Sequence, residues 1–289
     1  MSILINKQTK LIIQGITGRD GAFHAKSMLD YGTKVVAGVT PGKANQKVHG
    51  IPVFNSVAQA KKATDANTSI IFVPAPFAAD AIYEAIDAKL NLIVCVTEGV
   101  PTLAMIKLID YSKDKKTRLI GPNSPGLISP GQSKVGILPG ATFKKGKIGV
   151  VSRSGTLTYE IASHITHAGY GESTVIGIGG DPIIGTNYID CLKLFNSDPN
   201  THAIVIVGEI GGTDEEAAAK YVQRMIKKPV FGFIAGQTAP ADKRMGHAGA
   251  IISGGKGTAQ EKIQAFQKAG IEVIFEPSQI ALKLKQKLT

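Results

Sequence analysis

Short apolar runs rich in β-branched residues alternate with segments of helical period along the whole chain. The runs that we interpret as strands are residues 10–14, 34–39, 69–73, 92–97, 118–120, 147–152, 173–177, 203–207, 230–234 and 271–274. Residues 78–88, 156–168, 215–226 and 259–269 are examples of the segments between them, with apolar positions recurring about every 3.6 residues. Alternation of this kind predicts α/β architecture, with parallel sheets covered by helices on both faces.

A stretch rich in glycine and proline, residues 121–140, interrupts the pattern, which then starts again. We therefore expect two doubly wound domains, at residues 1–125 and 147–289, joined by a linker at residues 126–146. A length of 289 residues suits two domains. Ligands of such sheets collect at the carboxyl ends of the strands, so the loops after the apolar runs are the candidate sites.

Composition narrows the choice of partners. The net charge is +11, yet aromatic residues make up only 6% and tryptophan is absent. Stacking platforms for single-stranded nucleic acid are therefore scarce, and we expect a solvated basic surface or a phosphate-rich small ligand, with no nucleic acid. No apolar run approaches the roughly 18 residues that span a bilayer. We expect no membrane partner and a cytoplasmic location, or an organelle matrix if a presequence was removed.

Neither the two cysteines nor the histidine pair His164 and His167 indicates a metal site. Cys95 and Cys191 are far apart in apolar surroundings, which is typical of buried free thiols. His164 and His167 share one face of a predicted helix with Glu160, and we interpret that face as a solvated helix surface.

The first apolar run leads into a glycine-rich turn, residues 14–21 with the sequence QGITGRDG. Backbone N–H groups and the helix dipole at such a turn can hold a pyrophosphate, although a tight turn without a ligand explains the glycines equally well. The spacing differs from the G-x-G-x-x-G of nicotinamide and flavin sites. The second run, residues 34–39, is followed by TPGK at positions 40–43, with no acid for ribose hydroxyls. Lys43 there suits a phosphorylated ribose, as in coenzyme A or NADP, although a solvated surface lysine is the alternative.

His247 stands between small residues, in the stretch MGHAGA at positions 245–250. Its neighbours leave the imidazole uncovered and the loop able to move. A structural loop histidine and a nucleophile are equally compatible with that pattern.

Two further loops carry polar groups directly after predicted strands. Residues 151–156, VSRSGT, follow a strand and open a helix, so their N–H and hydroxyl groups can face a phosphoryl group. Residues 207–212, VGEIGG, place Glu209 at a strand end, where a solvated acid is the ordinary interpretation. Neither a Walker A loop nor a protein-kinase signature is present.

Together these stretches resemble the alpha subunits of succinate–CoA ligases over nearly the whole chain. The matching motifs in the first half are residues 15–21, 40–43, 73–77, 96–101 and 121–126, and residues 245–250 match in the second half. The resemblance implies a Rossmann-like CoA-binding domain followed by a flavodoxin-like ligase domain. It implies CoA contacts at Thr17, Gly18, Arg19, Asp20, Lys43, Val96, Thr97, Glu98 and Asn123. Position 124 is Ser where the family commonly has Cys, so a role for that thiol cannot operate here.

The resemblance also implies a mechanism. His247 takes a phosphoryl group, Glu209 holds its imidazole in one tautomer, Ser154 and Gly155 face the phosphate, and Tyr159 lies beside the carboxylate substrate. Succinyl-CoA, phosphate and a nucleoside diphosphate become succinate, CoA and the triphosphate, through succinyl phosphate and a phosphohistidine. ADP or GDP, with Mg²⁺, would bind mainly on a beta subunit in an αβ heterodimer or an α₂β₂ heterotetramer.

Three alternatives stay open. One is a sister ligase for malate or another acid, and the second is a non-catalytic CoA-binding regulator in which His247 is idle. The third, an NADP oxidoreductase, is disfavoured because the second domain offers no obvious hydride site.

Overall fold

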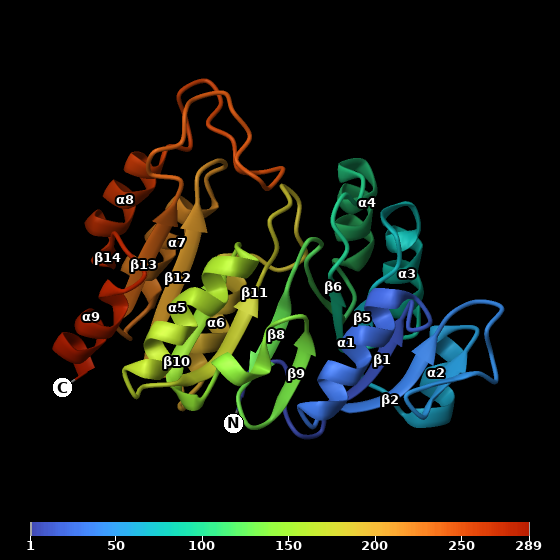
Figure 1. The fold of residues 1–289 in the computed structure, drawn as a ribbon. Helices are drawn as coiled ribbons and strands as arrows, with labels where there is room; N and C mark the ends of the chain where they lie inside the picture. Colours follow the sequence, from blue (N-terminus) through green and yellow to red (C-terminus); the bar gives the residue numbers. More distant parts are fainter. Residues whose placement is uncertain (1, 289) are drawn as a thin grey trace.

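The computed structural model describes residues 2–288 and has two α/β lobes side by side (Figure 1). The sheet of the first lobe contains β1 (Lys10–Gln14), β2 (Lys34–Val39), β3 (Lys47–Val48), β4 (Ile51–Phe54), β5 (Thr68–Ile71), β6 (Leu92–Cys95) and β7 (Arg118–Ile120). Its order is β3-β4-β2-β1-β5-β6-β7, and only the short β3 is antiparallel to its neighbour. Counted along the chain, the parallel strands run 3-2-1-4-5-6, which is the order of Rossmann domains. The prediction of a Rossmann-like first half is confirmed.

The second sheet contains β8 (Gly126–Ser129), β9 (Ser133–Gly136), β10 (Lys145–Ser152), β11 (Glu172–Gly177), β12 (Ala203–Glu209), β13 (Val230–Ala235) and β14 (Glu272–Ile274). The order is β14-β13-β12-β10-β11-β8-β9. Strands β10 to β14 are parallel, and counted along the chain they run 2-1-3-4-5. This is the flavodoxin-like order, so the fold predicted for the second half is confirmed as well.

Helices cover both faces of each sheet because successive strand residues point to opposite faces. In the first lobe these are α1 (Arg19–Asp30), α2 (Val57–Thr64), α3 (Ala75–Asp87) and α4 (Thr102–Ser112). In the second they are α5 (Gly155–His167), α6 (Tyr188–Ser197), α7 (Asp214–Met225), α8 (Ala259–Lys268) and α9 (Gln279–Leu288), with a 3-10 turn at Gly140–Thr142. On β1, Leu11 and Ile13 pack towards α1, while Ile12 packs towards α2 and α3. The α1 side shares one core with the α6–α8 side of the second sheet, so the core continues across both lobes.

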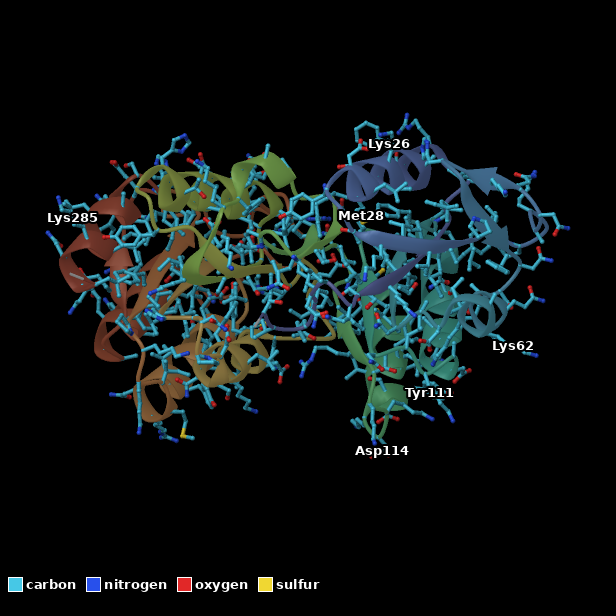
Figure 2. The ribbon with its side chains drawn as sticks, turned by 90° about the horizontal axis from the view of Figure 1, so that it is seen from below. Lys26, Met28, Lys62, Tyr111, Asp114 and Lys285 are labelled. Carbon is cyan, nitrogen blue, oxygen red and sulfur yellow. The ribbon has the colours of Figure 1, made fainter. Side chains whose placement is uncertain are left out.

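The prediction of a linker at residues 126–146 is wrong for residues 126–136. These residues form the antiparallel hairpin β8–β9 at the edge of the second sheet. A Cβ atom at Gly126 would lie 2.1 Å from the carbonyl oxygen of Val135, so glycine is required where the two paired strands approach each other most closely. The hairpin also binds the first lobe. Lys134 Nζ donates to Ser27 Oγ at 2.8 Å, and the Gly136 N–H approaches Met28 Sδ at 3.5 Å. Met28 lies where the two lobes meet (Figure 2).

Two smaller predictions concern thiols and membranes. Cys95 and Cys191 are both free and buried, as expected from their apolar surroundings. Within residues 2–288, no helix has the length and apolar character needed to cross a membrane.

Candidate functional site

A cavity of about 960 Å³ opens at the carboxyl ends of β1 and β5, where the strand order of the first sheet reverses. Dinucleotides bind at this position in Rossmann domains, and the volume suits a large ligand. The cavity is lined by the turn after β1, by the loops after β2 and β5, and by the start of α3. The predicted residues among its walls are Thr17, Gly18, Arg19 and Asp20.

Glycines shape the turn after β1. Gly15 has φ +82°, and a Cβ atom there would lie 3.1 Å from the backbone of Phe72. A Cβ atom at Gly21 would lie 2.2 Å from the Gly15 carbonyl oxygen, so the turn closes only with glycine. Gly18 precedes α1 without a side-chain cap, which leaves N–H groups of the first turn facing the cavity for an anion. Thr17 Oγ1 donates to Thr40 Oγ1 at 3.1 Å and ties this turn to the loop after β2.

Lys43 and the residues after β6 lie beside the cavity and outside its walls. Lys43 is exposed, two residues beyond Pro41, which does line the cavity. Val96, Thr97 and Glu98 follow the neighbouring strand, and Thr97 Oγ1 donates to the carbonyl of Val73, a cavity residue, at 2.7 Å. Glu98 is exposed, with its carboxylate 4.0 Å from Arg244 Nη2 of the loop that carries His247.

His247 lies in the loop between β13 and α8, residues 236–258, which reaches towards the first lobe at the top of Figure 1. We call this segment the histidine loop. His247 Nδ1 is 2.8 Å from Oε2 and 3.0 Å from Oε1 of Glu209, the last residue of β12. A carboxylate can only accept, so Nδ1–H donates and Nε2 is left with its lone pair. The hydrogen bond to Glu209 raises the pKa of His247 above its ordinary value, against the effect of burial. The imidazole is 27% exposed, which leaves Nε2 a path to a reactant.

The imidazole ring rests on a glycine. A Cβ atom at Gly180 would lie 2.4 Å from Cγ of His247, so any side chain at this position would displace the ring. The Gly180 N–H donates to the carbonyl of Asn123 at 3.2 Å, and Asn123 Nδ2 donates to Asp181 Oδ1 at 3.0 Å. Asp181 is buried, and burial raises its pKa. Asn123 therefore connects the first lobe to the histidine site, whereas it does not line the cavity.

Gly180 and Asp181 are absent from the residues predicted from sequence. The available signal is a glycine pair followed by an acid, directly after the apolar run 173–177. Parallel strands of one sheet end at the same edge, where ligands bind, so the residues after β11 lie at that edge.

The side chain of Ser124 has a structural role, because its hydroxyl makes two hydrogen bonds. It is buried, and Oγ donates to the Gly177 carbonyl at 2.6 Å while accepting the Gly126 N–H at 2.9 Å. A thiol is a weak donor and a weak acceptor, so serine is the better residue for these bonds. The hydroxyl thus holds the turn where the chain crosses between lobes.

Ser154, Gly155 and Tyr159 lie on the first turns of α5, which begins beside β12 and its Glu209. Ser154 caps the helix, because its Oγ accepts the Leu157 N–H at 3.2 Å. Gly155 is the first helical residue, and Tyr159 is partly exposed one turn later. No hydrogen bond within residues 2–288 joins them to His247, whose ring is bonded to Glu209. In the same described part, no three His, Cys, Asp or Glu side chains are grouped so that they could hold a metal ion.

Comparisons with known proteins match both lobes to families. Residues 6–99 match the CoA binding domain family, and residues 151–271 match the CoA-ligase family. The chain is 59% identical over 282 residues to the succinate–CoA ligase [ADP-forming] subunit alpha of Aquifex aeolicus, covering 97% of this chain and 92% of that protein. It is 58% identical over 284 residues to the subunit of that name in Staphylococcus aureus, covering 98% and 94%.

Among solved structures, ATP citrate lyase from Methanothrix soehngenii, in complex with citrate and coenzyme A, superimposes with a TM-score of 0.89 at 25% identity. This match covers 98% of the present chain and 51% of the lyase, so the chain spans about half of that protein. A dinucleotide-forming acetyl-coenzyme A synthetase from Ca. Korarchaeum cryptofilum has the same fold, with a TM-score of 0.71 at 19% identity.

The lobes occur in the order of the two matched families, and the relatives align over nearly the full length of the chain. An identity of 59% over that length is far above what a shared fold alone requires. This chain belongs to the family of succinate–CoA ligase alpha subunits.

Proposed function

We propose that this ligase subunit binds CoA in the first-lobe cavity and carries phosphate on Nε2 of His247. The observation that carries the proposal is the hydrogen bond of 2.8 Å from His247 Nδ1 to Glu209. It places the ring proton on Nδ1 and aims a nucleophilic nitrogen away from the carboxylate. A regulator that only binds CoA has no use for this arrangement.

The proposed reaction has three steps. A phosphate oxygen attacks the thioester carbonyl of succinyl-CoA, the C–S bond breaks, and CoA leaves as thiolate. Nε2 of His247 then attacks phosphorus, and the bond from phosphorus to the succinate carboxylate breaks. Finally, a terminal oxygen of the nucleoside diphosphate attacks the phosphohistidine, the P–N bond breaks, and the neutral imidazole returns.

The residues have separate roles. N–H groups at the start of α5, around Ser154 and Gly155, favour the phosphoryl charge because a helix N-terminus attracts anions. Tyr159 is proposed beside the carboxylate of succinate. Lys43 is proposed to bind the ribose phosphate of CoA, and Val96, Thr97 and Glu98 are proposed to form the rim near its pantetheine arm. Asn123 and Asp181 hold the turn against which His247 rests.

The nucleotide is proposed to bind on a beta subunit together with its Mg²⁺, in an αβ or α₂β₂ assembly. The names of the relatives favour ADP over GDP. Their bacterial origin favours a cytoplasmic location, which stays a prediction. The steps assigned to this chain use only its own side chains and backbone.

The test is phosphoryl transfer to His247. Incubating the assembled enzyme with γ-labelled nucleoside triphosphate should leave an acid-labile, alkali-stable label on this chain. His247→Asn should abolish the label and the net reaction, while CoA still binds with unchanged affinity. His167→Asn is the matched control, because that histidine is exposed at the end of α5 and its loss should leave labelling unchanged. A label that persists in His247→Asn would contradict the proposal, and assays with malate would distinguish the sister ligase.

A further inference from the structure

A buried cluster of charged side chains lies directly behind Glu209. It consists of Glu215 and Glu216 on the first turn of α7, Lys262 on α8, and Arg153 at the end of β10. Burying charges is costly unless each is paired and hydrogen-bonded, so a cluster in this position calls for a reason.

Glu215 is the member that contacts the candidate site. Its Oε1 accepts the backbone N–H of Glu209 at 3.3 Å, and Tyr188 OH lies 3.4 Å from the same oxygen. A Cβ atom at Gly208 would lie 2.6 Å from Cγ of Glu215, so glycine at 208 is what lets the carboxylate reach the end of β12. Glu215 therefore holds the backbone of Glu209, whose side chain binds His247.

Lys262 and Arg153 orient Glu215. Lys262 is 0% exposed, and Nζ donates to Glu215 Oε2 at 2.5 Å, to Glu216 Oε2 at 3.0 Å and to the Gly212 carbonyl at 3.1 Å. All three ammonium hydrogens are thereby used. Arg153 Nε lies 3.8 Å from Glu215 Oε1, while Nη1 donates to the Asp181 carbonyl at 3.2 Å. Burial raises the pKa of Glu215 and these cations oppose that rise, so its charge depends on them.

The cluster also fixes the turn on which the histidine loop rests. The Gly211 N–H donates to the Gly257 carbonyl at 2.8 Å, near the end of that loop. A Cβ atom at Gly211 would lie 2.0 Å from the Gly249 carbonyl oxygen, two residues after His247. Since Lys262 holds Gly212, one set of contacts sets both the position of Glu209 and the surface that receives the loop.

We propose that Glu215 is a positioning residue, which holds the end of β12 through the Glu209 N–H so that the Glu209 carboxylate meets His247 Nδ1. Lys262 and Arg153 keep Glu215 in place. The proposal deepens the phosphohistidine function and rests on it. Its structural part, the coupling of Glu215 to the bond between Glu209 and His247, can be measured without phosphorylation.

The test uses two double variants that differ in a single respect. Glu215→Gln with Lys262→Met removes the ion pair but keeps a carbonyl oxygen that can accept the Glu209 N–H. Glu215→Leu with Lys262→Met removes that acceptor as well. Neither leaves an unpaired buried ammonium, and replacing a buried ion pair by neutral groups is often close to neutral for stability. Circular dichroism and thermal unfolding would verify that both variants fold.

The first measurement is the pKa of His247 in the full chain, followed by NMR of the histidine rings, with the His247 resonance assigned from His247→Asn. The Gln/Met variant should keep the raised pKa. The Leu/Met variant should fall towards the ordinary value of about 6.5, since Glu209 no longer meets the ring. The second measurement is the rate of His247 phosphorylation in the assembled enzyme, where Leu/Met should be slower by about tenfold or more and Gln/Met nearly unchanged.

Glu216→Gln is the control, because Glu216 bonds the same ammonium yet is 22% exposed and lies away from Glu209. It should change neither measurement. Equal behaviour of the two double variants, or loss of the raised pKa in Gln/Met alone, would overturn the proposal. An altered pKa without any phosphorylation in the parent enzyme would instead contradict the proposed function and leave the positioning role standing. If Leu/Met did not fold, Glu215→Ala with Lys262→Met would replace it, because alanine also lacks the acceptor and adds no bulk.

Discussion

Three residues define the state of His247. Glu209 fixes the ring proton, Gly180 provides the flat surface under the ring, and the buried Asp181 follows Gly180 in the same turn. Sequence neighbours left His247 balanced between a structural and a chemical role, and family resemblance supplied Glu209 as its partner. Gly180 and Asp181 were not predicted, because a glycine pair followed by an acid after a strand indicates only a turn until the loop from residue 236 folds back onto it.

Glu209→Gln should move the acid limb of the pH–rate profile to lower pH. Attack by Nε2 requires the neutral imidazole, and Glu209 raises the pKa of His247 by stabilising the imidazolium. Activity is therefore lost as pH falls through this raised pKa, and a neutral amide brings the pKa back towards about 6.5. The maximal rate should fall about tenfold or more, because the ring becomes less basic and less firmly held. A profile whose acid limb stays in place would disagree with this assignment.

At the scale of elements, the apolar runs predicted each parallel strand except the short β4, with bounds shifted by a few residues. The run 69–73 extends past the end of β5 at Ile71, because the half-buried Phe72 and Val73 are as apolar as strand residues. The hairpin β8–β9 was missed since its strands are short and begin or end in glycine, which reads as a loop. Its pairing depends on contacts with β11, more than 40 residues away, as in the register of Val175 with Ile128.

The loop after β2 yields a prediction about CoA. Lys43→Ala should weaken CoA more than dephospho-CoA, by about 1–3 kcal/mol for the loss of a charged hydrogen bond. The loop itself should persist, because the N–H groups of Gly42 and Ala44 bond Asn55 Oδ1 at 2.9 and 3.3 Å. Calorimetric titration of both ligands would measure the difference, with Lys47→Ala as a control in the same region. Equal weakening of the two ligands would refute contact with the ribose phosphate.

Glu172, at the start of β11, should make the stability of the fold depend on pH. Burial raises the pKa of Glu172 to about 8, although Thr166 Oγ1 and the Lys144 N–H bond its carboxylate at 3.1 and 3.2 Å. The native state therefore binds a proton that the unfolded chain releases at lower pH, and the free energy of unfolding should fall as pH rises from about 4.5 to about 8. The slope is at most about 1.4 kcal/mol per pH unit.

Glu172→Gln should flatten that slope, so that the variant gains stability over the parent chain on going from pH 5.5 to pH 8. Thermal unfolding at the two pH values would measure this. Glu160→Gln, on the solvent side of α5, provides the comparison. Parallel pH dependences of parent and Glu172→Gln would show that this carboxyl is not the titrating group.

At the scale of the whole molecule, one core runs through both lobes and the hairpin β8–β9 joins them. The cavity and His247 are thereby held in one frame, with Asn123 and Thr97 between them. The Asn123 N–H donates to the Thr97 carbonyl at 2.9 Å, and Asn123 Nδ2 reaches Asp181. Sequence periodicity predicted each lobe separately, whereas their contact depends on side chains such as Lys134 and Ser27 that no pattern singles out.

The purified chain should be unable to make nucleoside triphosphate by itself. In the proposed mechanism, succinyl-CoA and phosphate bring the phosphoryl group to His247, and that group then needs a nucleotide that we propose to lie on the beta subunit. Activity should appear on adding the beta subunit and saturate at a fixed ratio of the two chains. A coupled assay of triphosphate formation, with His247→Asn as the inactive reference, would measure this. Turnover by the chain alone would disprove the division of labour.

The burial of both cysteines bears on how the protein withstands oxidation. The pKa of Cys95 is raised to about 12 and that of Cys191 is raised as well, so neither is a thiolate at neutral pH. Peroxide and disulfides react with exposed thiolates, whereas both thiols here are buried and position 124 at the lobe crossing is a serine. A coenzyme with a free thiol can therefore work beside this chain without forming a mixed disulfide, and oxidative inactivation should begin elsewhere, at residues such as the exposed Met245 two positions before His247.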